Sequence, residues 1–216
     1  ISGSNGLSTS GSGKLLTTTN NSYTGDTTIG AGTTLQLGEN TATGSLASLA
    51  IVNNGALVFN RTDVAASPLN VMALVSGSGT VAVNSGAVQF SNGNTYTGTT
   101  TIVNGATLLV GNKAAAGAIY QPTGVGTVTN NGALIFQRSD GSFASPLAIN
   151  ITISGSGKVT YQSGGVFQAN GVNSYSGGTT IQSDTVLILA ANSAAGTGDI
   201  TVASSGTLGL TGGITL

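Results

Sequence analysis

The side chains most able to form ionic contacts with a ligand occur in two similar triplets, Arg61-Thr62-Asp63 and Arg138-Ser139-Asp140. Each triplet places a guanidinium two residues before a carboxylate. Such a pair could contact a receptor or a glycan, or it could form a salt bridge within a loop outside the core. We favour the salt bridge, because the triplets recur with a longer repeat, and keep Arg61, Asp63, Arg138 and Asp140 as candidate surface contacts.

Most catalytic and metal-binding chemistries lack their usual residues. The chain has five Lys and Arg, six Asp and Glu, and no His or Cys. This composition excludes the common zinc sites, thiol nucleophiles and serine–histidine triads. We therefore predict no catalytic residue, no metal ligand and no cofactor. The formal net charge of −1, with scattered basic residues, also argues against nucleic-acid binding, which needs clustered Lys or Arg.

Tyrosines could provide flat surfaces on which sugars stack. Tyr23, Tyr96 and Tyr175 share an alternating face with isoleucines, which predicts that they are buried. Tyr120 and Tyr161 lie outside the recurring motif. These two are the freer candidates for surface contact with a glycan.

A motif that occurs three times organises the chain. Asn-x-Tyr-x-Gly-x-Thr-x-Ile begins at Asn21, Asn94 and Asn173, with spacings of 73 and 79 residues. Its alternation indicates strands with one inward face. We expect the motif glycine to face inward where the coil has little room. Leucine pairs continue the inward face in later strands, and we expect Leu208 and Leu210 to belong to it.

Nine corner residues separate the alternating segments and divide the chain into coils of about 24 residues. Glycine suits corners where the backbone has a positive φ, and aspartate tolerates that conformation better than most residues. Short strands between regularly placed corners predict a parallel β-solenoid. The expected corners are Gly13, Gly32, Gly55, Gly86, Gly105, Gly132, Gly164, Asp184 and Gly206.

The predicted coil spacing argues against two functions, a glycosidase with paired carboxylates and an ice-binding surface of threonines. Asp63 and Asp140 would lie three coils apart, or roughly 14 Å if they stack, whereas glycosidase carboxylates stand about 5–9.5 Å apart. The Thr pairs at 27–28, 100–101 and 179–180 would recur only every third coil. That spacing disfavours an ice-binding threonine array.

The motif, followed by Gly-x-x-Leu-x-Leu/Val-Gly, resembles the autotransporter-associated β-strand repeat found in passenger regions of large bacterial surface proteins. The matching stretches cover 21–38, 94–111 and 173–190, and the third has Asp184 and Ala190 where the others have glycine. The resemblance implies a right-handed parallel β-helix that is exported across the outer membrane and displayed at the cell surface. In the family such repeats are associated with adhesins, and no catalytic residues belong to the repeat.

We expect one continuous all-β solenoid of about nine coils, divided into units 1–74, 75–152 and 153–216 and belonging to a longer array. The expected function is a structural, non-enzymatic stalk or fibre segment of an extracellular bacterial passenger, serving adhesion or biofilm formation. Its expected partners are another copy, or a host receptor or glycan, with no insertion into a membrane. A glycan-binding module and a polysaccharide-cleaving β-helix enzyme are the alternatives.

Overall fold

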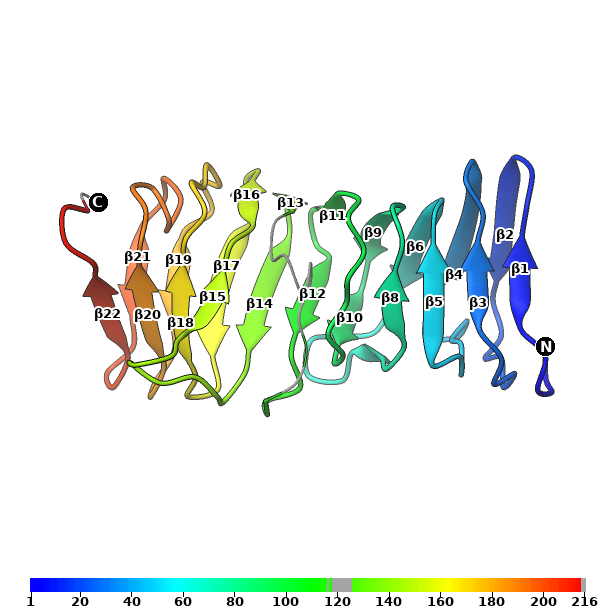
Figure 1. Ribbon diagram of the computed structural model, residues 1–216, viewed down its shortest axis with the longest axis horizontal. Coiled ribbons are helices and arrows are strands. Elements are labelled where there is room, and N and C mark those ends of the chain that lie inside the picture. The colour runs from blue at the N-terminus through cyan, green and yellow to red at the C-terminus, as the bar shows by residue number, and fades with distance from the viewer. Residues whose placement is uncertain (116, 118–125, 215–216) are drawn as a thin grey trace.

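A computed structural model of the chain describes residues 1–115, 117 and 126–214. These residues form strands and turns, with no helix, wound into a parallel β-solenoid of about nine turns. Figure 1 shows the coils following one another along the long axis of the molecule. The prediction of an all-β parallel solenoid is confirmed, whereas its right-handed winding stays a prediction from the resemblance.

The strands form four parallel sheets. The first sheet contains β1 (Leu7–Thr9), β3 (Thr27–Ile29), β5 (Ala50–Asn53) and β8 (Leu74–Ser76). The second contains β2 (Gly13–Thr17), β4 (Thr33–Thr41), β6 (Ala56–Arg61), β9 (Thr80–Ser85), β11 (Thr100–Ile102), β13 (Thr127–Asn130) and β16 (Thr152–Ser154). The third contains β7 (Leu69–Val71), β10 (Ala87–Phe90), β12 (Thr107–Val110), β14 (Ala133–Gln137), β17 (Lys158–Gln162), β19 (Thr179–Ile181) and β21 (Ile200–Val202). The fourth contains β15 (Leu147–Ile149), β18 (Val166–Ala169), β20 (Val186–Leu189) and β22 (Thr207–Leu210).

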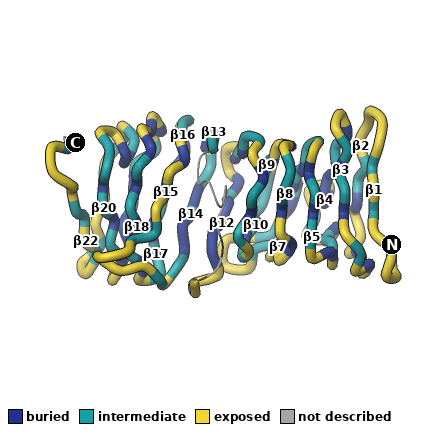
Figure 2. The backbone as a smooth tube through the Cα atoms, viewed as in Figure 1, coloured by how far each residue is buried: buried dark blue, intermediate teal, exposed yellow. Residues whose placement is uncertain are grey.

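Successive coils place apolar residues directly above one another. Leu35 of β4 pairs with Leu15 on one side and with Leu57 on the other. The strands alternate between buried and less buried positions, and one continuous core cluster results. Figure 2 shows the buried segments running along the solenoid, with exposed residues concentrated at the turns. The period-two patterns therefore act as predicted, with one face of each strand directed into the coil.

The motif asparagine connects adjacent coils. Its side-chain oxygen accepts a hydrogen bond from the backbone nitrogen of a residue one coil earlier, or from the terminal amino group in the first case. This satisfies a polar group that coil stacking would otherwise bury without a partner. The three bonds join Asn21 to Ile1 (2.8 Å), Asn94 to Val75 (2.8 Å) and Asn173 to Ile153 (2.7 Å).

The motif tyrosine and threonine form a buried hydroxyl pair. All three tyrosines have no exposed surface, which confirms the prediction of burial. The bonds join Tyr23 to Thr27 (2.7 Å), Tyr96 to Thr100 (2.6 Å) and Tyr175 to Thr179 (2.5 Å). The motif thus carries both members of each internal polar pair.

The motif glycine is required by lack of space. A Cβ added to Gly98 would lie 2.2 Å from the Gly79 carbonyl oxygen, and one on Gly25 would lie 2.4 Å from the Gly6 nitrogen. Backbone of one coil therefore rests on backbone of the previous coil. The expectation of little room at these positions is confirmed.

Equivalent strands of the three repeats lie in three different sheets. The Thr-Thr-Ile strands β3, β11 and β19 pair in the first, second and third sheets respectively. Each sheet forms one side of the solenoid, and the chain visits these three sheets in that order within a coil. Each repeat therefore spans three whole coils and one additional side. The expectation that Asp63 and Asp140 stack three coils apart is therefore wrong, because the repeat has moved to the next side. The recurring Thr pairs also lie on three sides.

The corner residues are of two kinds. Gly105 (φ 82°), Gly164 (φ 79°) and Asp184 (φ 62°) have the expected left-handed backbone. Gly55 and Gly132 do not, and neither does Gly206. A Cβ on Gly55 would lie 2.3 Å from the Thr33 carbonyl oxygen, so close approach selects glycine there.

Leu210 departs from the predicted inward stack. Leu208 is partly buried against the core, but Leu210 is 50% exposed. β22 is the outermost strand of the fourth sheet, so no later coil among the described residues covers this side chain.

Candidate functional site

Arg61 is the last residue of β6, and its guanidinium lies over the loop of the preceding coil. Nη1 donates to the Thr43 carbonyl at 2.5 Å, and Nη2 donates to the Ala42 carbonyl at 2.8 Å. Nε donates to Oδ2 of Asp63 at 2.8 Å. Each nitrogen of the guanidinium therefore has a protein acceptor, and only 2% of the side chain is exposed.

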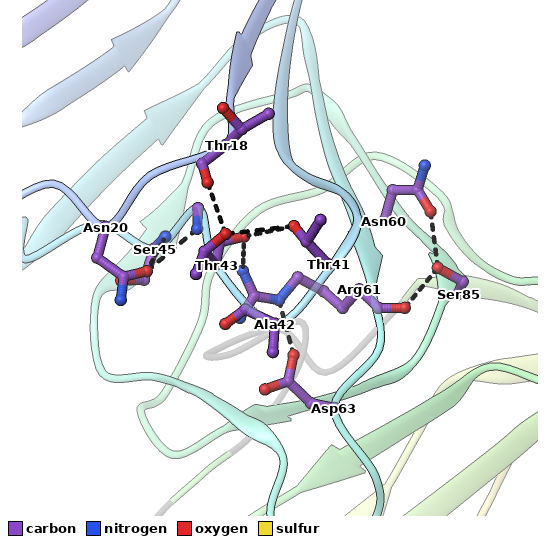
Figure 3. A network of polar contacts seen from close by, with 11 residues as sticks. Thr18, Asn20, Thr41, Ala42, Thr43, Ser45, Asn60, Arg61, Asp63 and Ser85 are labelled. Carbon is purple, nitrogen blue, oxygen red and sulfur yellow. Dashed lines mark hydrogen bonds and ion pairs between the residues drawn. The ribbon is translucent and has the colours of Figure 1, made fainter.

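Arg61 belongs to a column of polar contacts through four successive coils, which Figure 3 shows in close-up. The Thr43 hydroxyl donates to the Thr18 carbonyl in the coil before it, at 2.6 Å. The Ser85 hydroxyl, in the coil after Arg61, donates to the Arg61 carbonyl at 2.7 Å. The arrangement joins coils together and gives each nitrogen of the buried guanidinium an acceptor within the protein.

Arg138 repeats this arrangement directly after β14. Nε and Nη2 bind the two carboxylate oxygens of Asp140, at 2.9 and 2.6 Å. Nη1 donates to the Gly117 carbonyl at 2.9 Å, and Nη2 donates to the Ala115 carbonyl at 3.1 Å. The fork geometry of Arg suits such bidentate pairing with a carboxylate. This site is more open, because 20% of the Arg138 side chain and 30% of the Asp140 side chain are exposed.

Both triplets therefore contain the favoured salt bridge. The prediction of Arg61 as a surface contact is wrong, because backbone carbonyls and Asp63 occupy its buried guanidinium. Asp63, Arg138 and Asp140 keep partial exposure. Their contact with a receptor or glycan stays a prediction.

Tyr161 lies inside the solenoid. Its side chain is 1% exposed, stacks on Phe136 at a centroid distance of 5.2 Å and lies 5.3 Å from the Phe167 ring. It alternates with Val159 on the inward face of β17, so its prediction as a surface contact is wrong. Its hydroxyl has no hydrogen-bond partner among the described residues, and burial raises its pKa well above the usual value. Tyr120 lies outside the described residues.

Tyr175 is as deeply buried as Tyr161, but its hydroxyl has a hydrogen-bond partner. Burial raises the pKa of Tyr175 to about 12, while the hydrogen bond with Thr179 acts in the opposite direction. These shifts are consequences of core packing. They do not identify a catalytic group.

The chain is similar to an autotransporter adhesin. Over 67 residues it is 43% identical to the adhesin BmaC autotransporter of Brucella suis biovar 1 (strain 1330). The match covers 31% of this chain and 2% of the adhesin, so the chain spans only a small part of that protein's length. No protein-family model and no solved structure matched the chain. The distant, partial match and the β-solenoid fold are together consistent with autotransporter passenger repeats.

Two of the acidic residues, Asp184 and Asp199, have neutral hydrogen-bond partners in an adjacent coil. The Asp184 backbone N–H donates to the Ser205 hydroxyl oxygen, and the Asp199 carbonyl accepts from the Thr179 N–H. Among the residues that the structure describes, no cluster of three or more His, Cys, Asp or Glu side chains could hold a metal ion. The same part of the chain contains no helix of a length and apolarity that would cross a membrane.

The sequence analysis did not identify two features near the arginines. We call the segments from Arg61 to Ser67 and from Arg138 to Ser145 the arginine loops. The loops that receive the guanidinium groups begin and end with glycine, at Gly38 and Gly44 and at Gly111 and Gly117, and this spacing was visible. The second feature is the exposed turn of each arginine loop. Phe143 is 71% exposed on a turn closed by mutual hydrogen bonds between Ser142 and Ser145, each 3.1 Å long.

Proposed function

We propose that this chain is a rigid, non-enzymatic stalk or fibre segment of a passenger displayed on a bacterial surface. The observation that carries the proposal is the polar column around Arg61, which uses the strongest recognition group of the loop to join coils. Similarity to an adhesin over part of the chain supports surface display and a role in adhesion or biofilm formation.

The ladder geometry suits a stalk. Coils of a parallel solenoid are about 4.8 Å apart, so nine coils give a shaft of about 43 Å. Backbone hydrogen bonds between coils run along the shaft in several sheets at once. A bending force therefore has to break ladders on more than one side.

Display on a carrier tests this function. The chain is inserted into the passenger of an unrelated autotransporter, and the height of the displayed layer is measured by atomic force microscopy. We expect a rise of about 43 Å and no release of sugar from polysaccharides. A Gly98→Val insert is the matched control, because its side chain would collide with Gly79 and break the stacking. Polysaccharide cleavage, or equal heights for the two inserts, would refute the proposal.

A glycan-binding loop is the second candidate. It is favoured by Phe143, an exposed aromatic ring three residues after the half-open Arg138–Asp140 pair. Aromatic faces and charged hydrogen bonds are common means of binding sugars at a surface. A glycan array probed with the chain and with Phe143→Ser separates this function from that of an inert stalk.

Another copy of the chain is the other partner that we propose. Strand edges with unpaired N–H and C=O groups favour addition of a further strand, and head-to-tail addition of solenoids would lengthen the shaft. Light scattering over a concentration series tests this association. A strictly monomeric chain would exclude it.

A further inference from the structure

The chain contains six Asn-Gly dipeptides, a sequence that can modify itself. The glycine backbone nitrogen, once it has lost its proton, attacks Cγ of the asparagine side chain. A C–N bond forms, ammonia leaves, and a five-membered succinimide results. Water then opens the ring at either carbonyl and gives aspartate or isoaspartate, without any oxidant or reductant. The dipeptides begin at Asn5, Asn54, Asn92, Asn104, Asn131 and Asn170.

At Asn92 the two reacting groups already face each other. The Gly93 N–H donates to Oδ1 of Asn92 at 2.8 Å, which holds the side-chain carbonyl against the nitrogen that attacks it. Reaction is fastest from conformers with the reacting atoms about 3–3.5 Å apart. In the part of the chain that the structure describes, this contact between Oδ1 and the following glycine nitrogen occurs at Asn92 and at none of the other five dipeptides.

Three of the other asparagines are held away from this geometry. Oδ1 of Asn54 accepts from the Ser78 amide at 3.2 Å, and Oδ1 of Asn131 accepts from the Ser156 amide at 3.1 Å. Both side chains are therefore bound to the next coil. Oδ1 of Asn170 accepts from Nε2 of Gln168, and Nδ2 of Asn170 donates to Oδ1 of Asn150.

Asn92 and Gly93 also have room to react. Asn92 is exposed, and a Cβ placed on Gly93 would meet no atom within 4 Å. By contrast, a Cβ on Gly55 or Gly132 would lie 2.3 Å from a backbone oxygen. Ring closure rotates the backbone between the two residues, and the crowded corners resist this rotation.

We propose that Asn92–Gly93 is a self-modification site of the solenoid, where water and the chain's own backbone convert Asn92 to aspartate or isoaspartate. The change acts on a junction between coils. Nδ2 of Asn92 donates to the Met72 carbonyl at 3.2 Å, and a carboxylate cannot donate there. Isoaspartate also lengthens the main chain two residues before Asn94, which holds the Val75 amide of the preceding coil.

Timed peptide mapping by mass spectrometry tests the proposal. The folded chain is incubated at mildly alkaline pH, and conversion is followed at all six sites. We expect Asn92 to react at least roughly tenfold faster than Asn54 and Asn131. In urea the six rates should converge. Equal rates in the folded chain, faster conversion at Asn104 or Asn5, or a preference for Asn92 that persists in urea would overturn the proposal.

Gly93→Ala is the matched variant. The added methyl group fits without a clash, and the φ of Gly93 is outside the left-handed region, so the coil is preserved. The methyl group hinders the attacking nitrogen, and conversion of Asn92 should slow at least roughly tenfold at an unchanged melting temperature. Undiminished conversion in this variant would also overturn the proposal.

Discussion

The two arginine loops share one motif and one set of contacts but differ in burial. Arg61 and Arg138 each bind a carboxylate two residues later and two carbonyls of the preceding coil. Side-chain exposure is 2% for Arg61 and 20% for Arg138. The repeat therefore preserves the bonds, while residues outside the motif decide how much water reaches them.

The surroundings of Arg61 explain its deeper burial. The loop that receives its guanidinium contains Thr43, whose hydroxyl donates to the Thr18 carbonyl. The carbonyl of Arg61 itself accepts from the Ser85 hydroxyl. Among the described residues, the Arg138 carbonyl has no bond of this kind from the following coil. The difference makes Arg61 mainly a structural group, whereas contact of Arg138 with a partner stays a prediction.

Arg61→Ala tests the buried side of this comparison and should have the largest effect. We expect a loss of about 3–5 kcal/mol in the free energy of unfolding, because a partly buried carboxylate and two carbonyls lose a buried donor group. Urea denaturation followed by circular dichroism measures the loss. Lys158→Ala is the control, since Lys158 is exposed and forms no ion pair among the described residues. A loss no larger than that of the control would show that the column contributes little.

Arg138→Ala tests the more open site. We expect a loss of about 1.5–3 kcal/mol, the range for hydrogen bonds that involve charged groups, because water can replace part of the lost contacts. The same denaturation experiment gives the value. If Arg138→Ala costs as much as Arg61→Ala, burial is not what distinguishes the loops.

The strands and the inward face could be predicted because they depend on local periodicity. Tyr23, Tyr96 and Tyr175 alternate with inward Thr and Ile, and all three are buried as expected. Tyr161 obeys the same alternation with Val159. The prediction of surface contact for Tyr161 rests on neighbours that do not recur, yet burial depends on strand phase and not on recurrence.

The shift of each repeat to a new side could not be predicted, because coil length varies. Thr100 pairs with Val81 in the coil before it and with Val128 in the coil after it, and the second separation is much longer. Loops absorb the extra residues without changing the ladder. A repeat length in residues therefore does not give the number of sides that the repeat covers.

The partners of the arginines were also hidden from sequence analysis. Backbone carbonyls such as those of Ala42 and Ala115 have no residue-type signature. The Arg-x-Asp spacing indicated the salt bridge, but only the coil stacking brings the guanidinium over the preceding loop. Gly38 begins that loop with a φ of 83°, and a Cβ added to it would lie 2.5 Å from the Asn60 carbonyl oxygen, so both the backbone conformation and the lack of space select glycine.

Asp63→Asn and Asp140→Asn separate charge from hydrogen bonding in the two loops. Each change removes the ion pair but keeps an acceptor oxygen, so we expect a loss of about 1 kcal/mol or less at the more exposed Asp140. At Asp63 we expect a loss between that value and the loss for Arg61→Ala, because its partner guanidinium is buried. The Asp63 variant should lose more, because 16% of this side chain is exposed compared with 30% for Asp140. Denaturation at low and high salt measures both. Added salt should reduce the Asp140 effect more strongly, since exposed pairs are screened, and the reverse order would contradict the comparison.

Phe143→Ser should have the smallest effect on stability. Phe143 stands at the tip of its turn with most of its surface in water, and the bonds between Ser142 and Ser145 do not involve its ring. We expect a change within about 0.5 kcal/mol. Val64→Ser is the matched change in the first loop, because Val64 is 61% exposed on the corresponding turn. If the more open loop also binds sugars, Phe143→Ser should abolish glycan retention while Val64→Ser leaves it intact. Equal glycan retention by both variants would show that the arginine loops join coils and do not bind glycans.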